Sequence, residues 1–150
     1  MTEHPRRILL AEDDPHDLAL TLDVLRLHGL ADETVTVADG VEVLDYLLRR
    51  GAFASVPAGQ PAVVLLDLKM PRLGGLDVLA EIRRTASLRM LPVVMLSSSR
   101  EEADISRSYG LGANAYIVKP VDFDDFVEAI RVTGQFWTQI NVPPPGTAPP

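Results

Sequence analysis

An α/β fold is predicted for this chain, with five parallel strands covered by helices on both faces. Two observations predict it. Short apolar runs alternate with amphipathic stretches from one end of the sequence to the other, which is typical of a parallel sheet between layers of helices. Charged residues directly follow several of the apolar runs, and the carboxyl ends of the strands are where such sheets bind ligands.

The five expected strands are the short apolar runs Arg7 to Ala11, Thr34 to Val37, Ala62 to Leu66, Val93 to Leu96 and Ala115 to Val118. Between the first four strands, apolar residues recur at helical spacing and predict three amphipathic helices. The residues that mark these helices are Leu18, Leu22 and Leu25, then Val43, Leu44, Leu47 and Leu48, then Val78, Leu79 and Ile82.

The last two expected helices differ in their apolar content. The fourth, Glu101 to Tyr109, has only Ile105 and Tyr109 at helical spacing, so we expect it to be poorly anchored and able to move. The fifth, Asp122 to Gln135, has a fuller apolar face. Its members are Phe123, Phe126, Val127 and Ile130.

Two segments fall outside this alternation. Gly51 to Pro61 is rich in Gly, Pro and Ala and predicts a loop, whereas Val142 to Pro150 contains five prolines and predicts an extended or disordered tail. We therefore divide the chain into one domain, residues 1–141, and a Pro-rich tail, residues 142–150. Right-handed crossovers between five strands predict a flavodoxin-like, doubly wound sheet in the order 2-1-3-4-5.

Composition narrows the classes of function. The chain has 150 residues, 47% of them hydrophobic, and a net charge of −7, which argues against direct nucleic-acid binding because phosphate contacts need a basic surface. It has no cysteine, which excludes thiol catalysis and disulfides. No run approaches the roughly 18 apolar residues of a transmembrane helix. We expect a cytoplasmic protein that contacts neither membrane nor nucleic acid.

Acidic residues at strand ends predict a cation site. Glu12 and Asp13 follow the first apolar run, and Asp67 and Lys119 follow two others. Clustered carboxylates repel each other unless a cation joins them. Because no histidine or cysteine stands with them, Mg²⁺ is favoured over zinc. Asp14 is better interpreted as the N-cap of a helix that begins near Pro15.

Four motifs in order resemble the receiver domains of two-component response regulators, over about Arg6 to Phe136. They are Ile-Leu-Leu-Ala-Glu12-Asp13, Leu-Leu-Asp67-Leu-Lys69-Met-Pro71-x-x-Gly74-Gly75, Val-Met-Leu-Ser97 and Ala-Tyr116-Ile-Val-Lys119-Pro120. Ser97 and Lys119 lie 30 and 52 residues beyond Asp67. Their joint spacing makes the resemblance specific.

The resemblance implies the chemistry of the acidic residues. Asp67 matches the phosphoacceptor, whose carboxylate attacks a phosphohistidine or a small phosphodonor. Asp13 matches a direct Mg²⁺ ligand, Glu12 a ligand acting through water, and the backbone carbonyl of Lys69 the third protein ligand. The implied protein is a phosphoacceptor that catalyses only its own phosphorylation and dephosphorylation.

The resemblance also implies four roles around the phosphoryl group. Lys119 matches the lysine that pairs with phosphoryl oxygens, and Pro120 after it the cis-proline of the family. Ser97 matches the hydroxyl that hydrogen-bonds the phosphoryl group, and Tyr116 the aromatic switch.

The gap from Asp13 to Asp67 is longer than in the compact chemotaxis receiver, and the loop Gly51 to Pro61 accommodates the extra residues. This insertion, the Glu-Asp-Asp-Pro opening and the pair Phe136 and Trp137 most resemble single-domain regulators that partner bacterial phytochromes. The implied partner is a sensor histidine kinase, such as a bacterial phytochrome. The implied output is protein–protein interaction, or the chain drains phosphate from its kinase. Phe136 and Trp137 are candidate contacts of a homodimer. The alternative is that they fold back on their own domain.

Three other functions fit the sequence less well. A phosphatase of the haloacid-dehalogenase type needs a second acid two residues after its nucleophile, and Lys69 stands there. Gly110-Leu-Gly112-Ala-Asn-Ala115 fits a dinucleotide motif, but a helix precedes it and a strand follows, the reverse of the required context. An interaction module that no longer cycles phosphate would lack Asp13, Asp67 or Lys119, and all three are present.

Overall fold

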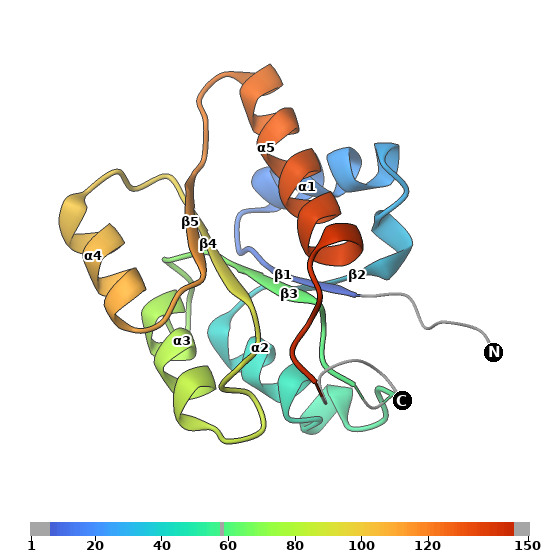
Figure 1. Ribbon diagram of the computed structural model, residues 1–150, viewed down its shortest axis with the longest axis vertical. Coiled ribbons are helices and arrows are strands. Elements are labelled where there is room, and N and C mark those ends of the chain that lie inside the picture. The colour runs from blue at the N-terminus through green and yellow to red at the C-terminus, as the bar shows by residue number, and fades with distance from the viewer. Residues whose placement is uncertain (1–6, 58, 146–150) are drawn as a thin grey trace.

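The sheet has the predicted topology. The computed structural model describes residues 7–57 and 59–145. Within them, parallel strands form one five-stranded sheet in the order β2-β1-β3-β4-β5 (Figure 1). The strands are β1 (Ile8–Ala11), β2 (Thr34–Val37), β3 (Val63–Leu66), β4 (Val93–Ser97) and β5 (Ala115–Val118). The predicted fold class and strand order are confirmed, and each strand boundary lies within one residue of its expected place.

Helices cover both faces of this sheet. The α-helices are α1 (Pro15–Leu27), α2 (Gly40–Leu47), α3 (Gly75–Arg84), α4 (Glu102–Gly110) and α5 (Phe123–Gln135), with short 3-10 turns at Ala31–Glu33 and Gly51–Phe53 and a π-helical turn at Phe136–Ile140. In Figure 1, α1 and α5 lie together on one face, and α2 and α3 lie on the other. Among the described residues, no helix is both long and apolar enough to cross a membrane.

Alternation along the strands creates two cores. Ile8 and Leu10 of β1 pack with α1 and α5, whereas Leu9 and Ala11 pack with α2 and α3. All four side chains are at most 1% exposed. A strand that is buried on both faces needs apolar residues at successive positions, which explains why β1 reads as an unbroken apolar run.

The helix α4 and the neighbouring edge strand β5 are less buried than α2. Ser108 is the only buried residue of α4, and every residue of β5 is half-buried. In contrast, α2 buries Val43, Leu44, Tyr46 and Leu47 in addition to Gly40. The weak apolar pattern of the fourth helix therefore corresponds to a helix with little buried surface.

The start of α5 departs from expectation. Phe123 was expected on the apolar face, but it is 60% exposed, whereas Phe126 and Ile130 are buried. Phe123 is the first residue of α5, and this first turn extends beyond the strand ends in Figure 1, where no strand lies beneath it. The apolar stripe is thus buried only from Phe126 onward.

The candidate contacts Phe136 and Trp137 have different surroundings. Trp137 is half-buried and packs against the core on the α1–α5 face. Phe136 is 40% exposed, Val132 is 49% exposed and Ile140 is 69% exposed. The three exposed residues are four positions apart, so they form one apolar stripe along α5 and the π-helical turn. Residues 142–145 form no helix or strand, and residues 146–150 of the expected tail lie outside the described residues.

The loop after α2 is closed by one side chain. Arg49 has a left-handed backbone conformation, with φ 55°, and its guanidinium lies over the Tyr46 ring, 5.2 Å from the ring centre. It donates hydrogen bonds to the backbone carbonyls of Tyr46 at 2.6 Å, of Pro57 at 3.0 Å, and of Gly59. Arg49 therefore joins the two ends of the segment predicted as a loop.

Candidate functional site

The charged residues predicted from the sequence meet at one edge of the sheet. Glu12 follows β1, Asp67 follows β3, Ser97 ends β4 and Lys119 follows β5. Parallel strands place their carboxyl ends together. These residues line a cleft of about 540 Å³, together with Asp13, Asp14, Asp17, Lys69, Ser98, Ser99, Arg100, Glu101 and Asp104.

Three carboxylates in this cleft are arranged for a cation. Glu12, Asp13 and Asp67 each offer an oxygen within 4.8 Å of the other two. Glu12 is buried, Asp67 is half-buried and Asp13 is exposed, so one side of the group stays open to water. Lys69 lines the same cleft, and its amide donates to Asp67 Oδ1 at 3.4 Å. A site of oxygen donors with an open side fits Mg²⁺ or Mn²⁺.

Lys119 is the basic counterpart of these acids. Its Nζ donates hydrogen bonds to Glu12 Oε1 and to Asp17 Oδ2, the latter at 3.0 Å, and lies 3.7 Å from Asp67 Oδ2. Only 12% of the lysine side chain is exposed. The Lys119 amide also donates to the Ser97 carbonyl at 2.8 Å, so the lysine starts from a fixed point of the sheet.

Burial and charge act in opposite directions at this pair. Burial raises the pKa of Glu12 to about 7 with the help of neighbouring Asp67, against the lowering effect of Lys119. For Lys119, burial disfavours the charged form, but the hydrogen bond to Glu12, the charge of Asp67 and the hydrogen bond to Asp17 outweigh it and raise its pKa. The Lys119 ammonium therefore stays charged. Its single positive charge does not balance the group of three neighbouring carboxylates.

Ser97 and Tyr116 lie on a hydrogen-bonded path from the cleft toward α4. Ser97 Oγ accepts from the Ser99 amide at 3.1 Å, and the Tyr116 hydroxyl donates to the Ser99 carbonyl at 3.0 Å. The Ser99 hydroxyl donates to Asp104 Oδ2 in α4 at 2.6 Å. The loop after β4 thus contacts the cleft, the tyrosine and the helix at once.

The expectation of a cis bond before Pro120 is wrong for this structure. The peptide bonds of the described residues contain no cis bond, so Lys119–Pro120 is trans. Trans is the more stable isomer of an X–Pro bond, by about 0.5–1 kcal/mol.

Sequence reasoning missed two contacts near the site. Asp17 binds Lys119, and Arg72 donates to buried Asp39 at 3.1 Å, which joins the loop after β3 to the start of α2. Asp17 stands in the first turn of α1, where an acid is usually explained by the helix dipole. One feature of the sequence could have indicated the contact of Asp17: α1 begins at Pro15, directly after the acidic residues that follow β1. Asp14 caps this helix, accepting from the His16 and Asp17 amides at 2.8 and 3.2 Å, as interpreted.

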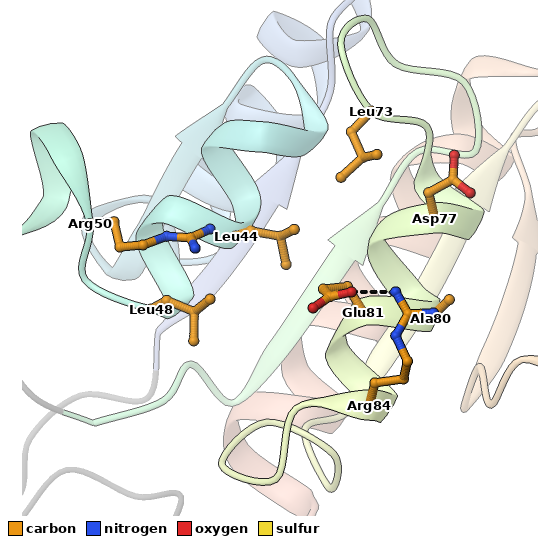
Figure 2. Close-up of a pocket in the computed structure, with 8 residues that line it drawn as sticks. All are labelled: Leu44, Leu48, Arg50, Leu73, Asp77, Ala80, Glu81 and Arg84. Carbon is orange, nitrogen blue, oxygen red and sulfur yellow. Dashed lines mark hydrogen bonds and ion pairs between the residues drawn. The ribbon is translucent and has the colours of Figure 1, made fainter.

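A second hollow of about 340 Å³ lies between α2 and α3 (Figure 2). Its apolar lining comes from Leu44, Leu48, Leu73 and Ala80. Its charged side chains are already paired in two cases, Glu81 with Arg84 and Arg50 with Asp45. None of the residues predicted as functional lies in it, so the chemistry is assigned to the acidic cleft.

Known proteins resemble this chain over most of its length. The model of the response regulator receiver domain family matches residues 8–131. Response regulator Rcp1 of Synechocystis sp. is 33% identical over 135 residues, which are 90% of each chain. A crystal structure of the Mn²⁺-bound form of Rcp1 matches with a TM-score of 0.85 and covers 93% of this chain and 99% of that one.

Two further solved structures are similar over nearly the whole chain. The phosphorylated cyanobacterial phytochrome response regulator RcpA is 35% identical, with a TM-score of 0.86, and the match covers 94% of this chain and 99% of that one. The bacteriophytochrome response regulator RtBRR is 52% identical, with a TM-score of 0.75, and the match covers 96% and 87%.

Proposed function

This chain belongs to the response regulator receiver domain family, and from that premise we propose that it accepts a phosphoryl group on Asp67 from a sensor histidine kinase. One observation carries the proposal. Asp67 stands 3.7 Å from the Lys119 ammonium and shares a three-carboxylate group with Glu12 and Asp13. Loss of Asp13, Asp67 or Lys119 would signal a receiver-like module that no longer cycles phosphate, and the presence of all three favours the phosphoacceptor.

The transfer is a displacement at phosphorus. An oxygen of the Asp67 carboxylate attacks, the new O–P bond forms as the P–N bond to the kinase histidine breaks, and the imidazole nitrogen keeps the electron pair. Lys119 offers a fixed positive charge to the phosphoryl oxygens. Asp13, Asp67, the Lys69 carbonyl and, through water, Glu12 would hold Mg²⁺, which would supply charge neutralisation between the attacking carboxylate and the phosphoryl group.

Intact mass spectrometry tests the site. Incubation with acetyl phosphate and Mg²⁺ should add one phosphoryl group, and Asp67→Asn should abolish the addition. Asp14→Asn, which keeps a capping side chain in the same cleft, is the matched control and should label normally. Labelling that persists in Asp67→Asn would overturn the assignment.

Asp13→Ala should weaken Mg²⁺ binding and stop phosphotransfer with the fold intact. Removal of one repelling carboxylate relieves strain without metal, so stability in the absence of Mg²⁺ should stay level or rise. A large loss of stability would instead make Asp13 a structural residue.

For the partner, we propose a bacterial phytochrome kinase. The support is the similarity to RcpA and RtBRR, which are described as phytochrome response regulators. A panel of purified histidine kinases, with and without phytochrome sensor domains, tests this. Transfer should be fastest from a phytochrome kinase, and preference for another class would contradict the proposal. Whether the chain signals forward or drains phosphate is read from whether its phosphorylated form binds a downstream protein.

For the switch, we propose that phosphorylation acts through Ser97 and Tyr116. A phosphoryl group on Asp67 would attract the Ser97 hydroxyl, which now accepts from the Ser99 amide, and so bias the loop that Tyr116 binds. Amide exchange over residues 97–116 should change on phosphorylation in the wild type but not in Ser97→Ala. An identical response in both would place the coupling elsewhere.

For self-association, we propose a homodimer that uses the stripe Val132, Phe136 and Ile140. These exposed apolar residues are typical of an interface core, whereas half-buried Trp137 supports the fold of its own domain. Light scattering should give a dimer that Phe136→Ser dissociates and the exposed-surface control Leu27→Ser does not. A monomeric wild type, or an unaffected dimer in Phe136→Ser, would contradict this interface.

A further inference from the structure

Asp17 makes a contact that no role described so far requires. It lies in the first turn of α1, and its position is fixed at both ends of the residue. Its amide donates to Asp14 Oδ1 at 3.2 Å, and its carbonyl accepts from Thr21 Oγ1 at 2.8 Å. The carboxylate then reaches across the cleft to Lys119 Nζ at 3.0 Å. Asp17 is outside the group of three carboxylates that fits a metal, so its partner is the ammonium.

The ammonium of Lys119 is thereby oriented. It has three N–H donors, and two of them are used by Glu12 and Asp17. Asp67 Oδ2 is 3.7 Å away, too far for a direct hydrogen bond. The third donor is thus left on the Asp67 side without a full bond to the resting carboxylate. That is the place of a donor meant for a group that arrives later.

We propose that Asp17 is a positioning residue that holds Lys119 ready for the phosphoryl group. A free lysine side chain loses up to about 2 kcal/mol of rotamer entropy when it is fixed, and here Glu12 after β1 and Asp17 in α1 fix it before the phosphoryl group binds. The inference rests on the proposed function, because it assigns Lys119 to phosphoryl oxygens.

The sign of the effect separates positioning from general electrostatics. Asp17 is negative, so long-range repulsion alone predicts that its neutralisation makes an anion bind more tightly. Positioning predicts the opposite, because Lys119 loses one of its two anchors. Asp14 lies in the same cleft and on the same helix end, and it makes no hydrogen bond or ion pair with Lys119. Asp14→Asn therefore removes a charge from the cleft but keeps a side-chain oxygen that can accept from the Asp17 amide, so it measures the effect of charge with both anchors of Lys119 in place.

The experiment is calorimetric titration with beryllium fluoride, an analogue of the phosphoryl group, in saturating Mg²⁺. Asp17→Asn should weaken binding about three- to tenfold, the range expected when one partly exposed ionic hydrogen bond is lost. Asp14→Asn should bind as tightly as the wild type or more tightly. Binding in Asp17→Asn that equals or exceeds that of the wild type would overturn the inference and leave the proposed function standing. A wild type that does not bind beryllium fluoride would overturn both.

A second readout follows the lysine itself. The chain has two lysines, Lys69 and Lys119, so nitrogen-15 spectra of the ammonium groups contain two assignable signals. Exposed Lys69 serves as an internal reference. In the wild type the Lys119 protons should be protected from exchange with water. That protection should be lost in Asp17→Asn and kept in Asp14→Asn. Equal protection in all three proteins would show that Asp17 does not hold the ammonium, whatever happens to stability.

Discussion

The α2–α3 side and the α4 side of the molecule pack against the sheet in different ways. Val43, Val78, Leu79 and Ile82 on the first side are completely buried. On the second side, Ser108 is the buried residue of α4. In place of apolar contacts, hydrogen bonds hold α4 and the loop before it. The Ser99 hydroxyl donates to Asp104 of α4, and the Ser99 carbonyl accepts from the Tyr116 hydroxyl.

This difference indicates which part of the molecule can change its conformation in response to a signal. Dense apolar packing resists small displacements because any shift opens a cavity, whereas a segment held by a few partly exposed hydrogen bonds opens at low cost. Among the described residues that line the acidic cleft, Asp104 belongs to α4 and none belongs to α2 or α3. Ser97 and Ser99 connect the cleft by hydrogen bonds to α4. Four measurements follow, ordered from the largest expected effect to the smallest.

Truncation of a buried side chain on each side should give the widest contrast. Leu79→Ala in α3 should lower the free energy of unfolding by about 2–5 kcal/mol, because the leucine is completely buried. Ile105→Ala in α4 should cost about 1 kcal/mol, because that side chain is half-buried. Urea denaturation measures both, and equal losses would contradict the packing difference.

Glycine substitution tests the same contrast through added volume. A Cβ at Gly40 would lie 2.1 Å from the Leu73 carbonyl oxygen, whereas at Gly110 it would meet nothing within 4 Å. Gly40→Ala should therefore destabilise by about 3 kcal/mol. Gly110→Ala should be neutral or stabilise by about 0.5 kcal/mol, since alanine has less backbone freedom to lose. Thermal melting of the two variants would refute the comparison if both fell equally.

A change of pH should alter the free energy of unfolding through the acidic cleft. Because the pKa of Glu12 is raised to about 7 in the folded protein, its stabilising contribution is complete below about pH 4.5, its unfolded value, and is lost as pH rises through about 7. Without Mg²⁺, the free energy of unfolding should fall by on the order of 2 kcal/mol between about pH 5 and about pH 8. Mg²⁺ should reduce this fall, since it pairs the ionised carboxylate.

Glu12→Gln is the control for that profile, because it keeps the shape and removes the titration. Its unfolding free energy should depend much less on pH over the same interval. A slope like that of the wild type would assign the titration to another group.

Removal of one hydroxyl should give the smallest effect. Tyr116→Phe deletes the hydrogen bond to the Ser99 carbonyl, at a cost of about 1 kcal/mol. Amide exchange should accelerate in the loop after β4 and in α4. Amides of α2 and α3 should exchange as in the wild type, and faster exchange there would mean that the two sides are not independent.

The sequence was sufficient for the strands and for the residues at their ends. Asp67, Ser97 and Lys119 follow or end apolar runs, and parallel topology alone brings such ends together. It was insufficient where a contact joins distant segments. The bond from Asp17 to Lys119 spans 102 positions and leaves no local pattern. Phe123 has the helical spacing of a core residue but stands beyond the strand ends, because spacing gives the face of a helix and not how far the sheet extends beneath it.

The hydrogen bonds of Arg49 indicate which positions of the loop after α2 can tolerate substitution. Its guanidinium binds the backbone carbonyls of Tyr46, Pro57 and Gly59, and every residue type has such a carbonyl. The exposed side chains of Ala52, Ala54, Ser55 and Pro57 can thus change without loss of closure. Phe53 and Val56 are constrained by their packing against the core, and Gly51 and Gly59, with φ of 56° and 111°, are constrained by backbone conformation. A saturation library should tolerate most exchanges at the exposed positions of this loop, but few at Arg49, Phe53 and Val56 and few changes in loop length.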